Sequence, residues 1–202
     1  AFAEALLVNK SLTYLDLKNN EIGGSGAATL ANMLRVNSTL KELHLCENMV
    51  GDEGTIALGN ALCVNESLQT LSLSSSEFSY EGSTALAKCV ERNSSLTRLN
   101  VVSKHPFGSN SHLTFFVDAL KNNQHLQGLE LSLKCEDAMR KFPAALMNTP
   151  LRELSIHSDC GNLEVLFLAL AKNRTVEVLE LDCSLCLHAA ESFCWLLECT
   201  KT

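Results

Sequence analysis

The sequence predicts an α/β solenoid, a curved array of strand–helix units with a parallel β-sheet on its concave face and helices on its convex face. Three observations support this fold class. Leucine accounts for 37 of the 202 residues, which indicates a repetitive core. One pattern of apolar residues occurs seven times along the chain. Within each copy the apolar period changes from two to a helical spacing, as expected for a strand followed by a helix.

The repeated frame is LxxLxLxxN, which first runs from Leu12 to Asn20. Its first apolar position returns at intervals of 28, 28, 28, 30, 25 and 25 residues, at Leu40, Leu68, Leu96, Leu126, Leu151 and Val176. Because the frames stay in register, residues 1–202 are predicted to form one domain of about seven repeats. The chain opens within half a helix, so we expect it to be a fragment of a longer protein.

The first repeat shows how each unit is built. Leu15 and Leu17 alternate with polar residues and predict a short strand, and a helix is predicted from the apolar spacing of Ala27, Leu30, Ala31 and Leu34. Glycine marks the strand-to-helix turn at positions 23 and 51. A helix is about 10 Å wide and strands lie about 4.8 Å apart, so the stacked array must curve with its strands inside. We expect a right-handed horseshoe segment.

These features resemble the leucine-rich repeat proteins of the ribonuclease-inhibitor subtype. The resemblance rests on repeats near 28 residues that carry LxxLxLxxN strands and true helices, and it covers nearly the whole chain. Repeats such as NSTLKELHLCEN, residues 37–48, look most like those of NOD-like receptors of innate immunity. The resemblance implies a protein-binding or ligand-sensing scaffold, or an autoinhibitory module of such a receptor. Fold is implied more strongly than function.

Composition excludes several other classes of protein. Lys and Arg total 16 against 23 Asp and Glu, which gives a net charge of −7. This acidic balance argues against nucleic-acid binding, which normally needs a basic surface. No stretch reaches the roughly 18 apolar residues of a membrane span, so we expect no membrane insertion.

The nine cysteines are an odd number and their spacing forms no disulfide framework. Cys89 occupies the core position that Ala61 fills one repeat earlier, and free cysteine packs as a small apolar residue. We therefore expect reduced thiols and a cytoplasmic location. Cys183 and Cys186 form a single CxxC pair, which without a second pair does not predict a zinc site.

Five Asn-x-Ser/Thr triplets all fall at the turn from helix to strand. They begin at Asn9, Asn37, Asn65, Asn93 and Asn173. The repeat itself accounts for them, and Asn at the end of a helix is expected to adopt the left-handed conformation common there. A secreted glycoprotein is the alternative, and a mass excess from glycans would reveal it.

No catalytic motif is present. The chain has no GxxxxGK phosphate loop, no GxGxxG turn, no GxSxG elbow and no HExxH pair. We therefore predict that the protein is not an enzyme and uses no metal or cofactor.

The candidate site is the concave strand surface, because each frame places three side chains off the core. They form three rows that cross the repeats, and the residues expected to contact a partner are Tyr14, Asp16, Glu42, His44, Arg98, Glu130, Glu153, His157, Glu180 and Asp182. The last three repeats are the most acidic, with only His157 and Arg152 nearby as bases, so the expected partner is a protein with a basic surface. A solvated acidic face is the alternative.

Two further features of the surface are open to interpretation. The stretch 104–110 and the shortened fifth and sixth repeats predict irregular loops and weakened helices, which are either a binding feature or drift. Apolar ends of the solenoid make self-association possible. Alternative functions of this repeat type are a GTPase-activating protein like that of Ran and an enzyme inhibitor like ribonuclease inhibitor.

Overall fold

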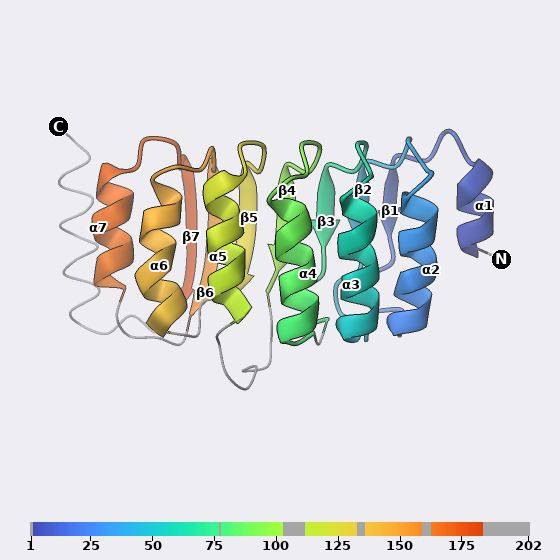
Figure 1. The fold of residues 1–202 in the computed structure, drawn as a ribbon, viewed down its shortest axis with the longest axis horizontal. Helices are drawn as coiled ribbons and strands as arrows, with labels where there is room; N and C mark the ends of the chain where they lie inside the picture. The colour runs from blue at the N-terminus through green and yellow to red at the C-terminus, as the bar shows by residue number, and fades with distance from the viewer. Residues whose placement is uncertain (1, 77, 103–111, 133–135, 159–162, 184–202) are drawn as a thin grey trace.

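The computed structural model describes residues 2–76, 78–102, 112–132, 136–158 and 163–183. Within these ranges seven helices alternate with seven strands (Figure 1). The helices are α1 (Phe2–Val8), α2 (Gly24–Leu34), α3 (Gly51–Leu62), α4 (Tyr80–Val90), α5 (His112–Asn122), α6 (Glu136–Leu146) and α7 (Glu164–Lys172). The strands are β1 (Tyr14–Asp16), β2 (Glu42–His44), β3 (Thr70–Ser72), β4 (Arg98–Val101), β5 (Gly128–Ser132), β6 (Glu153–Ser158) and β7 (Val178–Cys183).

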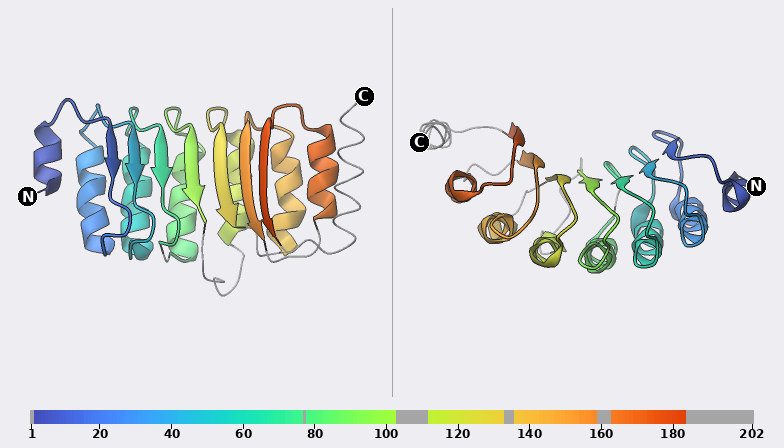
Figure 2. Two further views of the ribbon diagram at one scale, coloured as in Figure 1. Left: turned by 180° about the vertical axis from the view of Figure 1, so that it is seen from behind. Right: turned by 90° about the horizontal axis from the view of Figure 1, so that it is seen from above.

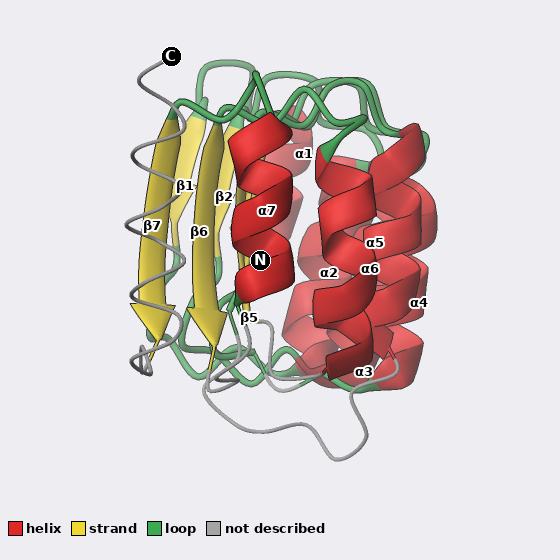
Figure 3. Ribbon diagram, turned by 90° about the vertical axis from the view of Figure 1, so that its left-hand side faces the viewer, coloured by secondary structure: helices red, strands yellow, loops and turns green. Residues whose placement is uncertain are grey.

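The strands form one parallel sheet in chain order, β1 to β7. The register is that of the sequence frame, so equivalent positions of neighbouring repeats are paired. Leu15, Leu43 and Leu71 therefore lie side by side on β1, β2 and β3. Seen from above, the array is an arc with strands on its inner side and helices on its outer side (Figure 2). The end-on view shows the same two layers (Figure 3). The predicted α/β solenoid with a concave sheet is therefore confirmed.

The core lies between these two layers and is built from the leucines of the frame. Leu43, Leu45, Leu71 and Leu73 are fully buried, and similar residues follow in the later strands. The helices contribute small and apolar residues at helical spacing, such as Ala27, which has no exposed surface. Each repeat buries its apolar face against its neighbours, which is why one repeat alone would not fold.

Asparagines at the helix-to-strand turns join each repeat to the one before it. The amide Nδ2 of Asn65 donates to the carbonyls of Leu34 at 2.7 Å and Asn37 at 3.1 Å. Its Oδ1 accepts from the backbone N–H of Ser67 at 2.9 Å and of Leu68 at 2.7 Å. Asn37, Asn93 and Asn123 repeat this arrangement in the neighbouring turns.

The sequence predicts a left-handed backbone conformation for the asparagines at the helix ends, and the structure differs. Asn37, Asn65 and Asn93 are not among the residues with positive φ. They are buried instead, because the backbone amides and carbonyls of two adjacent turns need polar partners there. The repeat therefore accounts for these Asn-x-Ser/Thr triplets through hydrogen bonds and not through backbone conformation.

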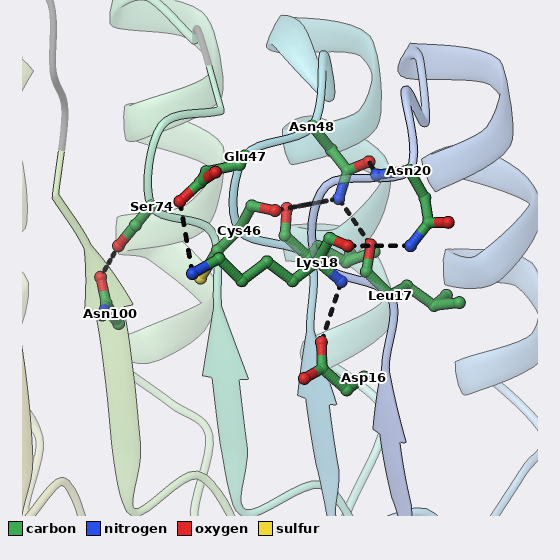
Figure 4. Close-up of polar contacts among 10 residues, drawn as sticks. Asp16, Leu17, Lys18, Asn20, Cys46, Glu47, Asn48, Ser74 and Asn100 are labelled. Carbon is green, nitrogen blue, oxygen red and sulfur yellow. Dashed lines mark hydrogen bonds and ion pairs between the residues drawn. The ribbon is translucent and has the colours of Figure 1, made fainter.

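A second asparagine links repeats at the ends of the strands (Figure 4). Asn48 donates to the carbonyl of Leu17 at 2.9 Å and accepts from the backbone N–H of Asn20 at 3.0 Å and Ile22 at 2.9 Å. Ser76 fills this position one repeat later, and its hydroxyl reaches only the carbonyl of Leu45 at 3.4 Å. The corresponding positions of the later repeats, and the irregular stretch 104–110, lie outside the described residues.

The expectation that the cysteines are free thiols is wrong for one pair. Cys63, at the end of α3, forms a disulfide with Cys89 of α4, and their Cα atoms lie 4.9 Å apart. Cys89 does lie in the core, with 2 % of its surface exposed, as its repeat position indicated. Cys46 is a half-buried free thiol. Cys186 lies outside the described residues, and with it the CxxC pair.

The shortened repeats keep their helices. Helix α6 has 11 residues although it contains Pro143, and α7 has 9. The strands there are longer than the N-terminal ones: β6 and β7 have six residues each and β1 has three.

The two glycines at the predicted strand-to-helix turns differ in conformation. Gly51 has a φ of 59°, whereas Gly23 is extended. In the described part of the chain, no helix has the length and hydropathy of a membrane span.

Candidate functional site on the concave strand surface

The concave surface is formed by the strand residues that alternate with the buried leucines. Three rows run across the repeats, because parallel strands in register bring equivalent positions side by side. The first row reads Tyr14, Glu42, Thr70, Arg98, Gly128, Glu153 and Val178. The second reads Asp16, His44, Ser72, Asn100, Glu130, Ser155 and Glu180, and the third reads Lys18, Cys46, Ser74, Val102, Ser132, His157 and Asp182.

Arg98 of β4 reaches over β5 to Glu153 of β6. Its Nε and Nη2 donate to the two carboxylate oxygens of Glu153, at 3.1 and 2.6 Å. Gly128 lies between them in the row, and a Cβ there would stand 2.9 Å from Cγ of Arg98. The absence of a side chain at Gly128 is therefore what lets the guanidinium cross the strand.

This ion pair offsets part of the negative charge of the C-terminal strands. The hydrogen bond to Glu153, followed by its charge, raises the pKa of Arg98. The same hydrogen bond lowers the pKa of the Glu153 carboxyl. Both groups are therefore held in their charged forms, and Glu153 is not a free anion.

A chain of polar contacts continues along the second and third rows. The hydroxyl of Ser74 donates to Asn100, whose Nδ2 donates to Glu130. His157 then lies between two carboxylates, with Nε2 at 3.2 Å from Glu130 and Nδ1 at 3.0 Å from Asp182. Only the protonated imidazole can donate to both at once. Glu130 is thus fixed in place by contacts on both sides.

The N-terminal part of the surface has its own contacts. The rings of Tyr14 and His44 lie 5.2 Å apart, and Nδ1 of His44 is 3.1 Å from the hydroxyl of Ser72. Asp16 accepts from the backbone of Lys18, whose side chain forms an ion pair with Glu47 at 3.3 Å (Figure 4). These residues form a polar face at the N-terminal end of the sheet, and His44 and Ser72 extend it to the recess described next.

One recess stands out on the concave face, and we call it the concave hollow. It has a volume of about 300 Å³ and spans strands β2 to β7. Most of its lining residues are polar or charged members of the first two rows, with leucine at its base, but the lining surface they expose is more apolar than polar. The lining residues on which the argument depends are Arg98, Gly128, Glu130, Glu153, Ser155 and Glu180.

Five of the candidate residues line one recess, and the other five lie around it. His44, Arg98, Glu130, Glu153 and Glu180 all line the concave hollow. Tyr14, Asp16 and Glu42 lie toward the N-terminal end, and His157 and Asp182 lie in the third row beside the hollow. Arg152, expected as a nearby base, pairs instead with Glu177 at 3.0 Å.

Sequence reasoning misses the residues that shape the hollow. Gly128 and Ser155 do not stand out in the sequence, because small side chains carry no charge or aromatic ring. The register places Gly128 between Arg98 and Glu153, and Ser155 between Glu130 and Glu180, so a small residue flanked by charged residues in a row is the signal that could have found them. Among the described residues, no group of three or more His, Cys, Asp or Glu is arranged to hold a metal ion.

Comparison with known proteins agrees with this architecture. The family profile described as leucine-rich repeat matches residues 8–31, 36–59 and 64–87, which are the first three repeats. The chain thus contains leucine-rich repeats, and its fold is a leucine-rich repeat solenoid. Comparison with curated protein sequences found no match.

Two solved structures are similar to the chain. The actin-binding site 2 of leiomodin-1 has a TM-score of 0.63 at 20 % identity, covering 71 % of this chain and 84 % of that one. The tropomodulin C-terminal domain of Caenorhabditis elegans has a TM-score of 0.62 at 14 % identity, covering 72 % of this chain and 92 % of that one. At such identities the likeness establishes the fold alone.

Proposed function

We propose that this protein is a non-catalytic scaffold that binds a partner protein on its concave strand surface. One observation carries the proposal: three rows of strand residues alternate with the buried leucines on an in-register sheet, and the first two rows line a preformed hollow. These side chains are not needed for packing, because the leucines between them fill the core. A preformed surface also loses little conformational entropy on binding.

The partner that suits this surface has a basic face. The chain carries a net charge of −7, and the C-terminal strands present Glu130, Glu180 and Asp182. Part of this charge is offset by Arg98, which pairs with Glu153. The remaining excess is negative, so complementary charge on a partner would speed association and set its orientation.

Two more specific roles belong to this proposal. The resemblance of the repeats to those of NOD-like receptors supports a sensing or autoinhibitory module of an intracellular receptor of innate immunity. The likeness in fold to the actin-binding site of leiomodin-1 makes actin a second partner to test. Inhibition of a ribonuclease and activation of a GTPase are the other activities known for this repeat type.

The test is affinity capture with variants of equal net charge. A Glu130→Lys, Glu180→Lys variant reverses two acids of the concave hollow, and a Glu66→Lys, Glu164→Lys variant reverses two exposed acids elsewhere. We expect the captured protein to be lost from the first variant and at high salt, and retained by the second. Equal retention by both would contradict binding at the concave surface.

Purified candidates then identify the partner. Cosedimentation with filamentous actin, inhibition of ribonuclease A, and GTP hydrolysis by Ran would each be measured with the same three proteins. An activity is assigned to the concave surface only if the Glu130→Lys, Glu180→Lys variant loses it and the Glu66→Lys, Glu164→Lys variant keeps it.

A further inference from the structure

The disulfide on the convex side joins a surface position of one helix to a core position of the next. Helices α3 and α4 lie side by side there (Figure 1). Cys63, which follows the last residue of α3, is exposed, whereas Cys89 of α4 has 2 % of its surface exposed. The S–S bond therefore runs inward from the surface, and its two sulfurs differ in their access to solvent.

The repeat frame accounts for this difference in burial. One repeat before Cys89 the equivalent residue is Ala61, which is fully buried. Cys63 is the C-cap residue of α3, and the C-cap residues of α2 and α4 are Arg35 and Glu91. The position of Cys89 thus belongs to the core, and the position of Cys63 takes polar side chains in the neighbouring repeats.

Access determines which of the two sulfurs an external thiol attacks. In thiol–disulfide exchange a thiolate attacks one sulfur in line with the S–S bond, from the side opposite the leaving sulfur. For Cys63 that side faces solvent, because Cys89 lies inward of it. For Cys89 that side lies within the apolar core, where close packing excludes a thiol. Attack on Cys63 is therefore the favoured route in the folded protein.

We propose that Cys63 is a surface site of thiol–disulfide exchange with a small thiol of the glutathione type, and that this exchange releases α3 from α4. The thiolate forms a bond to Sγ of Cys63 and the Cys63–Cys89 bond breaks. Cys89 leaves with the electron pair of that bond and takes up a proton from solvent. One disulfide replaces another, so the step needs no further oxidant or reductant. The site does not depend on the function proposed for the concave surface.

Burial of Cys89 also slows the reverse reaction. Closing the cross-link again requires the Cys89 thiolate, and a thiolate is unfavourable in apolar surroundings. The mixed disulfide on Cys63 therefore persists until a second external thiol removes the glutathione.

The hydrogen bonds beside the disulfide indicate where the release is felt. The backbone N–H of Asn93 donates to the carbonyl of Cys89 at 2.9 Å, and its Nδ2 donates to the carbonyl of Leu62 at 2.7 Å. Leu62 directly precedes Cys63, so Asn93 contacts both helix ends that the disulfide holds together. The amide of Asn93 should therefore open more often once the cross-link is broken.

Peptide mapping tests the site directly. The folded protein is incubated with reduced glutathione, quenched with acid, and alkylated in denaturant with N-ethylmaleimide. We expect at least about tenfold more glutathione on Cys63 than on Cys89, with N-ethylmaleimide on Cys89. Glutathione divided equally between the two cysteines, or found mainly on Cys89, would overturn the proposal.

Two matched variants test the difference in access. Cys89→Ala leaves Cys63 as a free thiol, Cys63→Ala leaves Cys89, and both lack the cross-link. With oxidised glutathione, Cys63 in the first variant should react at least about tenfold faster than Cys89 in the second. Similar rates in two variants with native circular dichroism would contradict the protection of Cys89. The mapping of the wild-type protein does not depend on either variant folding.

Urea separates exchange in the folded protein from exchange after unfolding. Below the unfolding transition, the rate at which glutathione appears on Cys63 should change by less than about twofold. A steep rise with urea would show that the bond is reached only after opening, and would contradict attack at the native surface.

Hydrogen exchange measures the release of the helix ends. In the glutathione adduct the amide of Asn93 should exchange at least about threefold faster than in the disulfide form. The amide of Asn173, which donates to Ala169 at 2.9 Å in a distant repeat, should not change. Equal exchange of Asn93 in both forms would contradict the release of α3 from α4.

Discussion

Arg98 pairs with Glu153 over Gly128, so one side chain joins three neighbouring strands of the concave face. The contact uses both oxygens of the carboxylate, which gives it more geometric definition than a single ion pair. Both side chains are about half exposed, and solvent therefore weakens the attraction. We therefore expect the Arg98–Glu153 pair to affect the local geometry and charge of the concave hollow more than the global stability of the protein.

The first prediction concerns the titration of Glu153. The hydrogen bond from Arg98 lowers its pKa below the ordinary value of 4.5, so its charged form is favoured in the folded protein. The stabilisation it contributes is present above that ordinary value and is lost as the pH falls through the lower, folded-state pKa. Carboxyl-carbon NMR should show Glu153 titrating below the ordinary glutamate value of 4.5. In an Arg98→Ala variant the pKa should rise, and an unchanged value would contradict the pairing.

The second prediction concerns the asparagines of the turns. Asn65→Ala removes the side chain that makes two bonds to carbonyls of the preceding repeat and two to its own turn. Because buried backbone groups lose their partners, we expect the free energy of unfolding to fall by about 3 kcal/mol. Urea denaturation measures it. Asn122→Ala, which loses one surface bond to Glu91, should change stability by less than about 0.5 kcal/mol. Similar losses in both would argue against the bridging role.

The third prediction tests the leucine core. Leu71 is fully buried in the middle of the sheet, whereas Leu168 on α7 has 49 % of its surface exposed. Leu71→Ala should cost about 2–5 kcal/mol, through lost burial and the cavity that remains. Leu168→Ala, the same change at an exposed site, should cost well under half of that. A small effect at Leu71 would mean that the repeats do not stack as described.

The sheet register and the inward leucines are predictable because a strand has a strict period of two and the frame repeats without slippage. Leu43, Leu71 and Leu99 can therefore be assigned to neighbouring core positions from the repeat alone. The charge of the C-terminal strands is harder to predict from the sequence, because Glu153 is paired with Arg98. That contact skips a strand and depends on Gly128 having no side chain. The asparagine hydrogen bonds are also missed, since Asn at a helix end suggests a local role and the bonds in fact reach about 30 residues back.

The disulfide escapes prediction for a related reason. Cys63 and Cys89 are separated by 26 residues, close to one repeat, so the solenoid brings them together although they do not occupy equivalent positions. Cysteine counts alone cannot show this, because pairing depends on which sides of α3 and α4 face each other.

The last prediction tests this disulfide and its contribution to stability. Mass spectrometry after alkylation without reductant should show Cys63 and Cys89 unmodified and linked in one peptide pair. Closing a loop of this length restricts the unfolded chain, so reduction should lower the free energy of unfolding by about 3 kcal/mol. A Cys63→Ser variant should already be destabilised, and reductant should then have no further effect on it. A wild-type protein that unfolds equally with and without reductant would contradict the cross-link between α3 and α4.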